Sequence, residues 1–252
     1  ASLKAEPVLT EPLTLPYNVT AITAQDKMDT SDLPQSLSVP REIIPDAIVS
    51  GGVQFNISKD DKNAMVCRGQ TVTLPEGTKK LWLLASSVDG DRLVAFNVGG
   101  KEVDLLIQDW QEAVGAWDLI GLGETGYVKK DVLAWNATHA HTKTGDEIAK
   151  QLYFFKYAID IPEGVKEITL PKVEEILILA ATATSDNTVF APAAELFDSL
   201  EKRPFDYKIT REEYIKARPS TVEQILQKKI DRKKSLTIDS SMINSTLQVG
   251  DA

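Results

Sequence analysis

The chain contains two histidines, His139 and His141, and both lie in the segment AWNATHAH. Side chains alternate along a β-strand, so residues two apart point to the same face. Asp146 and Glu147 follow a few residues later, and two imidazoles with one carboxylate form a ligand set that can hold a transition metal. Two interpretations follow. One is a metal site built from His139, His141 and Glu147, with Asp146 as the other candidate carboxylate; the other is a structural or docking role for the two histidines.

The structural role is the one that the sequence favours. A third histidine is missing, so a metal would depend on a carboxylate from residues 143–147, which have the composition of a mobile loop. Ordering such a loop costs about 1–2 kcal/mol per residue before any ligand bond forms. Neutral imidazoles can instead form hydrogen bonds through both nitrogens, and the hydroxyls of Thr138 and Thr142 are nearby candidate partners. We therefore expect no metal at these histidines and no cofactor for the chain.

Three tryptophans lie near this segment in the sequence: Trp110, Trp117 and Trp135. Exposed aromatic rings can stack on the apolar face of a sugar. Together with the two histidines and Asp146, the tryptophans are candidates for a carbohydrate-binding or docking face. Tryptophans of β-sandwiches also fill the core, so their solvent exposure decides between these interpretations.

Two further motifs do not predict a functional site. Gly121, Gly123 and Gly126 match the glycine fingerprint of dinucleotide-binding proteins, but that fingerprint must open a helix. Here the strand-like run YVKKDVLAW follows, so we expect no nucleotide binding. Cys67 is the only cysteine and lies in the apolar run AMVCRGQTV, which predicts a buried, unreactive thiol.

The composition argues against some classes of partner. The net charge of −9 over 252 residues disfavours binding to nucleic acid or to an anionic membrane surface. The longest apolar runs are too short to span a bilayer, so we expect no membrane insertion. Asn-x-Ser/Thr triplets favour a secreted or periplasmic protein. Such triplets also arise by chance in threonine-rich β proteins, and a cytoplasmic location stays an alternative. The triplets begin at Asn18, Asn56, Asn136 and Asn244.

From Gly51 onward the sequence reads as a series of short strands. GGVQFNIS alternates apolar and polar residues, LWLLASSV predicts a buried strand, and the turn VDGDR leads into LVAFNV, which predicts a hairpin. TLPEGTKKLWLLASS (73–87) also resembles TLPKVEEILILAATA (169–183), as expected for two equivalent strand pairs in a two-sheet sandwich. We predict an all-β fold, a β-sandwich of the galactose-binding-like or jelly-roll type.

Changes of composition divide the chain into three parts. Residues 1–50 are rich in Pro, Ser, Thr and Asp and predict one short strand followed by a linker. Residues 51–192 form the predicted sandwich. Residues 193–252 predict a helical C-terminal extension, because two capping-box patterns precede an apolar stripe between Val222 and Ile230.

Several segments, taken in order, carry a resemblance to a known family: VTLPEGTKKLWLLASSVDGD, FNVGGKEVDLLIQDW, YVKKDVLAWNATHAHTKTGDE and YFFKYAIDIPEGVKEITLP. Together they resemble the C-terminal β-sandwich region of bacterial glycoside hydrolase family 38 (α-mannosidase-like) proteins, over about residues 13–209. Two places depart from that pattern. Relatives usually carry Arg between the two histidines, where this chain has Ala140, and more tyrosines where it has Ala149, Lys150 and Gln151.

The resemblance implies an accessory role. In that family a separate N-terminal domain carries the zinc ion and the aspartate nucleophile, and no such domain is recognisable in this chain. We therefore assign no catalytic residue and expect no glycosidase activity from the chain alone, which leaves open whether it belongs to an enzyme. The expected partners are carbohydrate or a glycosidase catalytic domain. The alternatives are a small metalloenzyme with a His-x-His site on a β-sandwich, and a purely structural or interaction domain.

Overall fold

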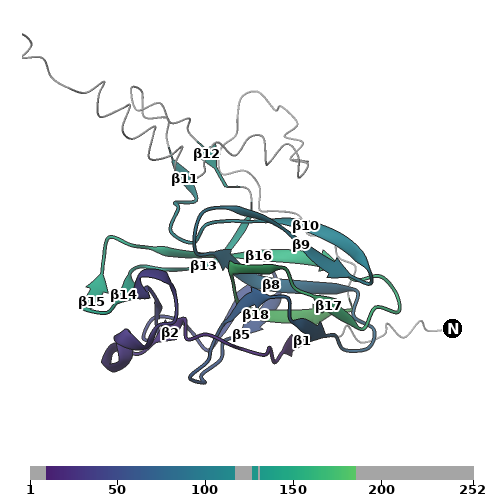
Figure 1. Ribbon diagram of the computed structural model, residues 1–252, viewed down its shortest axis with the longest axis horizontal. Helices are drawn as coiled ribbons and strands as arrows, with labels where there is room; N and C mark the ends of the chain where they lie inside the picture. Colours follow the sequence, from purple (N-terminus) through teal and green to yellow (C-terminus); the bar gives the residue numbers. More distant parts are fainter. Residues whose placement is uncertain (1–9, 117–126, 130, 186–252) are drawn as a thin grey trace, which may run out of the picture. The chain divides into compact units, whose positions relative to one another are not determined.

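The computed structural model describes residues 10–116, 127–129 and 131–185, and strands dominate it (Figure 1). A six-stranded sheet has the order β1-β18-β8-β16-β13, with β6 also paired to β18. A four-stranded sheet has the order β10-β9-β17-β7. The strands of the first sheet are β1 (Thr10–Leu13), β6 (Met65–Arg68), β8 (Lys80–Ser87), β13 (Val132–Ala137), β16 (Leu152–Asp160) and β18 (Lys172–Thr184). Those of the second are β7 (Thr71–Thr73), β9 (Arg92–Val98), β10 (Lys101–Ile107) and β17 (Glu167–Thr169).

Smaller elements complete the described part of the chain. Two short 3-10 helices and four two-stranded pairings lie outside the large sheets. They are η1 (Gln25–Thr30), η2 (Pro34–Ser36), β2 (Ile22–Thr23) with β3 (Val39–Pro40), β4 (Ala47–Ser50) with β5 (Val53–Asn56), β11 (Gly115–Ala116) with β12 (Tyr127–Val128), and β14 (Ala140–Thr142) with β15 (Gly145–Glu147). No helix among these residues is long and apolar enough to cross a membrane. Trp117, the Gly121–Gly126 segment and the predicted C-terminal helices lie outside the described residues.

The two large sheets pack against each other through one hydrophobic cluster. Leu81 and Leu83 of β8 and Phe155 of β16 belong to it, together with Phe96 of β9 and Ile168 of β17 from the four-stranded sheet. Each of these side chains is almost fully buried. The prediction of an all-β sandwich is confirmed.

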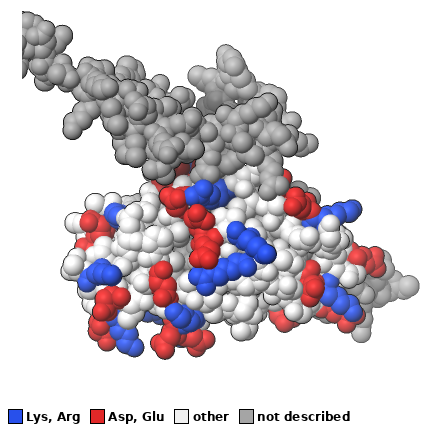
Figure 2. Space-filling model, in the orientation of Figure 1, with Lys and Arg blue, Asp and Glu red and all other residues white. Residues whose placement is uncertain are grey.

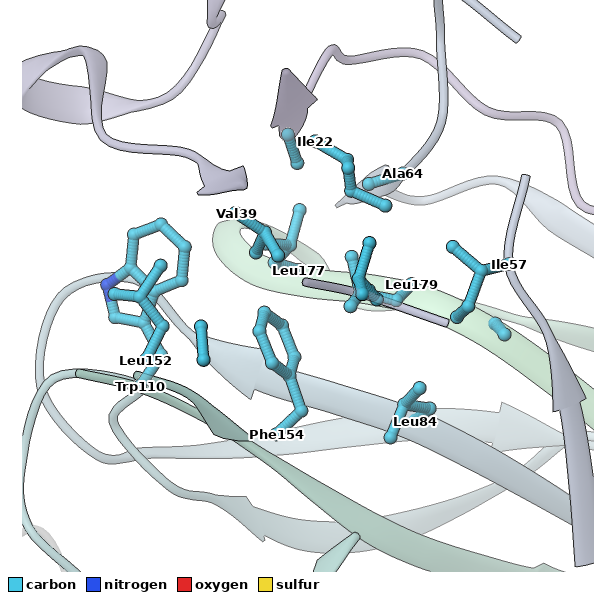
Figure 3. Packing of buried hydrophobic residues seen from close by; sticks show 14 of the residues in the cluster. Ile22, Val39, Ile57, Ala64, Leu84, Trp110, Leu152, Phe154, Leu177 and Leu179 are labelled. Carbon is cyan, nitrogen blue, oxygen red and sulfur yellow. The ribbon is translucent and has the colours of Figure 1, made fainter. Parts of the chain in front are cut away.

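The other face of the six-stranded sheet is buried as well, by residues 19–57, which we call the N-terminal layer. Leu84 of β8, Phe154 of β16 and Leu177 of β18 pack there against Ile22 and Val39 of this layer (Figure 3). Burial on both faces explains why every residue of LWLLASS is apolar or small, since no side of β8 meets water. A short strand is predicted in residues 1–50 and is present as β1. The stretch predicted as a loop or linker, residues 23–36, contributes the buried side chains of Thr23 and Leu33 to this third layer.

The two similar segments near residues 73–87 and 169–183 occupy equivalent places. β7 and β17 pair with each other in the four-stranded sheet, and β8 and β18 pair in the six-stranded sheet. In each segment the chain leaves the four-stranded sheet at Leu-Pro. It enters the six-stranded sheet after a turn in the first segment and directly at Lys172 in the second. The prediction that the two segments form equivalent strands in the two sheets is confirmed.

The hairpin predicted at Asp89–Gly90 is wrong. β8 has β16 and β18 as its two neighbours, so both of its edges are occupied, and the turn carries the chain across to β9 in the other sheet. β9 pairs instead with β10 through the two-residue turn Gly99–Gly100. Both glycines have positive φ, 59° and 84°, the conformation that the tightest hairpin turns require.

Cys67 lies on β6 inside the cluster between the two sheets, and its exposed fraction is 0%, which confirms the predicted buried thiol. Burial raises the pKa of this thiol from 9.0 to about 12. Only the thiolate is nucleophilic, and at pH 8 it then makes up roughly one molecule in ten thousand. We expect a thiol-specific reagent to leave Cys67 unmodified in the folded chain and to react at once in denaturant. Rapid reaction at pH 8 without denaturant would contradict this.

The raised pKa of Cys67 also predicts a pH dependence of stability. The unfolded chain releases the thiol proton near pH 9 and the folded chain near pH 12, so between these values the folded state binds more protons. The contribution of the buried neutral thiol is therefore complete below pH 9 and is lost as the pH rises toward 12.

Candidate metal site at the β14–β15 hairpin

The two histidines lie where the chain leaves the six-stranded sheet. β13 ends at Ala137, Thr138 and His139 form a bend, and β14 begins at Ala140. β14 pairs with β15 along one edge. Along its other edge His141 exchanges two backbone hydrogen bonds with Ser38, of 3.0 and 3.1 Å. The hairpin therefore lies against the N-terminal layer, as the labels β14, β15 and β2 show in Figure 1.

The imidazole of His141 is fully buried, with an exposed fraction of 0%. Its Nδ1 lies 2.9 Å from Oγ1 of Thr23 on β2, and that oxygen lies 2.7 Å from Oγ of Ser38. Thr23 and Ser38 are buried too. One nitrogen of His141 is thus held by a buried chain of hydroxyl groups.

The second nitrogen of His141 has no hydrogen-bond partner although it is buried. Nε2 faces two carboxylates: Oδ1 of Asp146 at 3.4 Å and Oε2 of Glu42 at 3.5 Å. The Glu42 and Asp146 side chains are partly exposed, at 43% and 38%. Buried polar atoms are nearly always satisfied in folded proteins, so this nitrogen calls for a physical explanation.

His139 completes the cluster. Its ring centroid lies 6.2 Å from that of His141, so the two imidazoles lie on the same side of the chain even though the strand is interrupted before Ala140. Nδ1 of His139 lies 3.2 Å from Oγ1 of Thr138, one of the two hydroxyl partners that the sequence suggests. The other, Thr142, donates instead to the carbonyl oxygen of Gly145. One ligand atom each from His139, His141 and Asp146 lie within 4.8 Å of one another.

The structure brings Asp146 to the histidines, and not Glu147. In the hairpin register His141 lies opposite Asp146, while Ala140 lies opposite Glu147. Directly opposite side chains point to the same face of a sheet, so the carboxylate beside His141 must be that of Asp146. Glu147 accepts a hydrogen bond from the backbone N–H of Ala149 instead. Pairing of residues 140–142 with 145–147 also replaces the expected mobile loop by a short hairpin.

Trp110 cannot belong to a sugar-binding face. Its exposed fraction is 1%, and its ring meets Phe154 edge to face in the core. Trp135 on β13 is half-buried and also packs against Phe154, with ring centroids 6.2 Å apart. Among the described residues of the predicted aromatic face, only Trp135 therefore has a partly exposed ring.

A second polar cluster lies at the ends of β9, β10 and β13. Nζ of the buried Lys129 lies 2.8 Å from Oε2 of Glu112 and 3.4 Å from Oδ1 of Asp91. Nε2 of Gln108 donates to Oδ2 of Asp131 at 2.6 Å, and burial raises the pKa of Asp131. These polar and charged groups satisfy one another, unlike Nε2 of His141, and we interpret the cluster as structural.

Two packed sheets with a third layer define the described part of the chain as a β-sandwich domain. The family of AziU2-like beta-sandwich domains matches residues 9–187, and the chain belongs to this family. No curated protein sequence matches the chain. The family description does not connect the chain to glycoside hydrolase family 38. The match begins at residue 9, which agrees with the inclusion of the N-terminal layer in the domain.

Proposed function

We propose that this β-sandwich domain binds a divalent transition-metal ion through His139, His141 and Asp146. The observation that carries the proposal is the buried Nε2 of His141, which has no hydrogen-bond partner and faces Asp146 across the hairpin. A metal ion would satisfy this nitrogen. Imidazole and carboxylate ligands together suit zinc and its neighbours among the transition metals.

One distance in the cluster fits a bound ion directly, and the ligand atoms of all three residues lie within 4.8 Å of one another. Nε2 of His141 and Oδ1 of Asp146 are 3.4 Å apart, which is long for a hydrogen bond. Zinc binds nitrogen and oxygen at about 2.1 Å, so two ligands of one tetrahedral ion lie about 3.4 Å apart.

The surroundings of His141 also suit a ligand. For Nε2 to bind a metal, Nδ1 must carry the proton and donate it. Oγ1 of Thr23 is the acceptor at 2.9 Å, and the Thr23 hydroxyl can then donate to Ser38 at 2.7 Å. Hydrogen bonds of this kind orient metal-binding imidazoles and fix their tautomer.

The hairpin supports this proposal over the structural role that the sequence favours. The cost of ordering residues 143–147 counted against a metal. In the hairpin, β14–β15 pairing and the bond from Thr142 to Gly145 offset that cost without any metal. The site is then largely formed before an ion arrives.

We expect the chain, after treatment with a chelator, to bind one zinc ion in a calorimetric titration. His141→Gln should weaken binding by more than about 100-fold, because loss of a ligand exceeds the 10–100-fold effect of its supporting hydrogen bonds. Glu147→Gln is the matched control and should bind like the wild type, since Glu147 pairs opposite Ala140. Absence of zinc binding in the wild type, or equal binding by His141→Gln, would refute the proposal.

We further propose, as the second candidate, an accessory role in carbohydrate breakdown. Its support is the resemblance to the α-mannosidase-like sandwich region together with the partly exposed ring of Trp135, four residues before His139. The burial of Trp110 counts against a broad aromatic platform. Calorimetry with α-mannosides tests this role: binding that Trp135→Ala abolishes would support it, and no heat with the wild type would remove it.

A further inference from the structure

We propose that Glu42 supplies a fourth ligand to the same ion, so that the site is closed and joins the N-terminal layer to the β14–β15 hairpin. This inference rests on the metal binding proposed above. It concerns what the ion does: a closed, four-coordinate ion has a structural role, whereas three protein ligands would leave a position open for water or substrate.

Glu42 approaches the same nitrogen as Asp146 from a different part of the chain. Oε2 of Glu42 lies 3.5 Å from Nε2 of His141, against 3.4 Å for Oδ1 of Asp146. Each value is close to the separation of about 3.4 Å between ligands of one tetrahedral zinc ion. Glu42 lies outside the group of His139, His141 and Asp146 whose ligand atoms are within 4.8 Å of one another, so its carboxylate would move toward the ion on binding. Glu42 follows β3, and Asp146 lies in β15.

The carboxylate of Glu42 is oriented by the backbone. Its Oε1 accepts a hydrogen bond of 2.6 Å from the N–H of Gln25, the first residue of η1. The other oxygen, Oε2, is the one that faces His141. A ligating carboxylate is commonly fixed in this way by a hydrogen bond to its second oxygen.

The charges of the four groups balance those of a divalent cation. Two neutral imidazoles and two carboxylates carry a total charge of −2, which a divalent ion neutralises beside the buried imidazole of His141. Burying unbalanced charge is costly. The competing occupant of the same space is a proton on His141, which would form ion pairs with Glu42 and Asp146 and need no metal.

The ion would connect segments about 100 residues apart in the sequence. His141 already contacts the N-terminal layer through Ser38 and Thr23. A ligand from Glu42 adds a bond that forms only when the metal is present. Binding to the folded state alone stabilises it, and we infer that this stabilisation is concentrated where the hairpin meets residues 23–42.

The test uses Co²⁺ in the full-length chain, because four-coordinate Co²⁺ absorbs visible light much more strongly than five- or six-coordinate Co²⁺. We expect the wild type to give the strong spectrum and to show no change on addition of azide. Glu42→Ala should still bind Co²⁺ through the three remaining ligands, but more than about 100-fold more weakly, because loss of a ligand exceeds the effect of a supporting hydrogen bond, and its spectrum should shift with azide at the vacated position. Glu147→Ala is the matched control and should behave as the wild type.

Zinc protection provides an independent readout. Zinc should raise the melting temperature of the wild type more than that of Glu42→Ala, and it should slow hydrogen exchange in residues 23–42 of the wild type more strongly. A wild-type Co²⁺ site that binds azide, or a Glu42→Ala variant with unchanged affinity, would overturn the inference while metal binding stands. Failure of the wild type to bind any metal would instead refute the proposed function.

Discussion

A chain that begins at Gly51 is expected to show no cooperative thermal unfolding. Residues 10–50 supply β1, which pairs with β18 from Thr10 to Leu13, and much of the N-terminal layer. Side chains of this layer that are no more than 5% exposed include Val19, Ile22, Leu37, Val39 and Ile48. Their removal would expose the outer face of the six-stranded sheet to water.

The size of the expected loss of stability follows from the number of buried side chains that are removed. Burial of one aliphatic side chain contributes about 1.5–3 kcal/mol, and a whole domain is stable by only about 5–15 kcal/mol. Five such side chains together approach that total, before the outer face of β8 and β18 is counted. The truncated chain is therefore expected to lose its folded state.

Near-ultraviolet circular dichroism and calorimetry measure this directly. The control is a chain that ends after Ile209, which keeps both sheets and the N-terminal layer and should melt cooperatively. A cooperative transition in the chain that begins at Gly51, within a few degrees of the full-length chain, would show that the N-terminal layer is dispensable. That result would support the prediction from composition that this part of the chain is a linker.

Local patterns were sufficient to predict the sandwich. The alternation of VQFN and the run LWLLASS, which is apolar or small throughout, report which faces of a strand meet the core, and this information is local. The repeated Leu-Pro, charged turn and apolar strand near residues 73–87 and 169–183 even predicted which strands are equivalent. Such patterns state that a face is buried, but not which segment covers it.

The errors in the fold all concern long-range partners. VDGDR has the residues of a hairpin turn, yet β8 already pairs with β16 and β18, both far away in sequence. Residues 23–36 have the composition of a linker, yet Leu33 among them belongs to the core cluster that also contains Leu84 of β8 and Phe154 of β16. The pattern of residues in a single sequence does not show which of several possible strands a given strand pairs with.

Only part of the candidate site could be predicted, because the pattern shows neighbours in the sequence but not long-range partners. The His-x-His spacing identified both imidazoles, and the choice of Asp146 over Glu147 needed only the hairpin register, which a two-residue turn at Lys143–Thr144 would have predicted. Glu42 and Thr23 could not have been found, because they lie about 100 residues before His141 in a segment without a distinctive pattern.

Replacement of Asn63 by Ala is expected to lower the free energy of unfolding by about 3 kcal/mol. Asn63 is 5% exposed and connects the N-terminal layer to the strand β6 that follows it. Its Oδ1 accepts hydrogen bonds of 2.9 Å from the N–H groups of Ala21 and Ile22, and its Nδ2 donates to the carbonyl oxygen of Ile22 at 2.8 Å.

The size of this effect comes from the groups that the substitution leaves behind. Ala at position 63 removes the acceptor of two buried N–H groups and the donor of one buried carbonyl, and each buried group without a partner costs about 1–3 kcal/mol. Relaxation and entering water recover part of this sum. Asn56→Ala is the matched control, because Asn56 is exposed on β5, and it should change stability by less than about 0.5 kcal/mol. Urea unfolding followed by tryptophan fluorescence gives both values. Equal, small losses for the two variants would mean that the N-terminal layer is held by its apolar contacts alone, and the side chain of Asn63 would then have no role in attaching it.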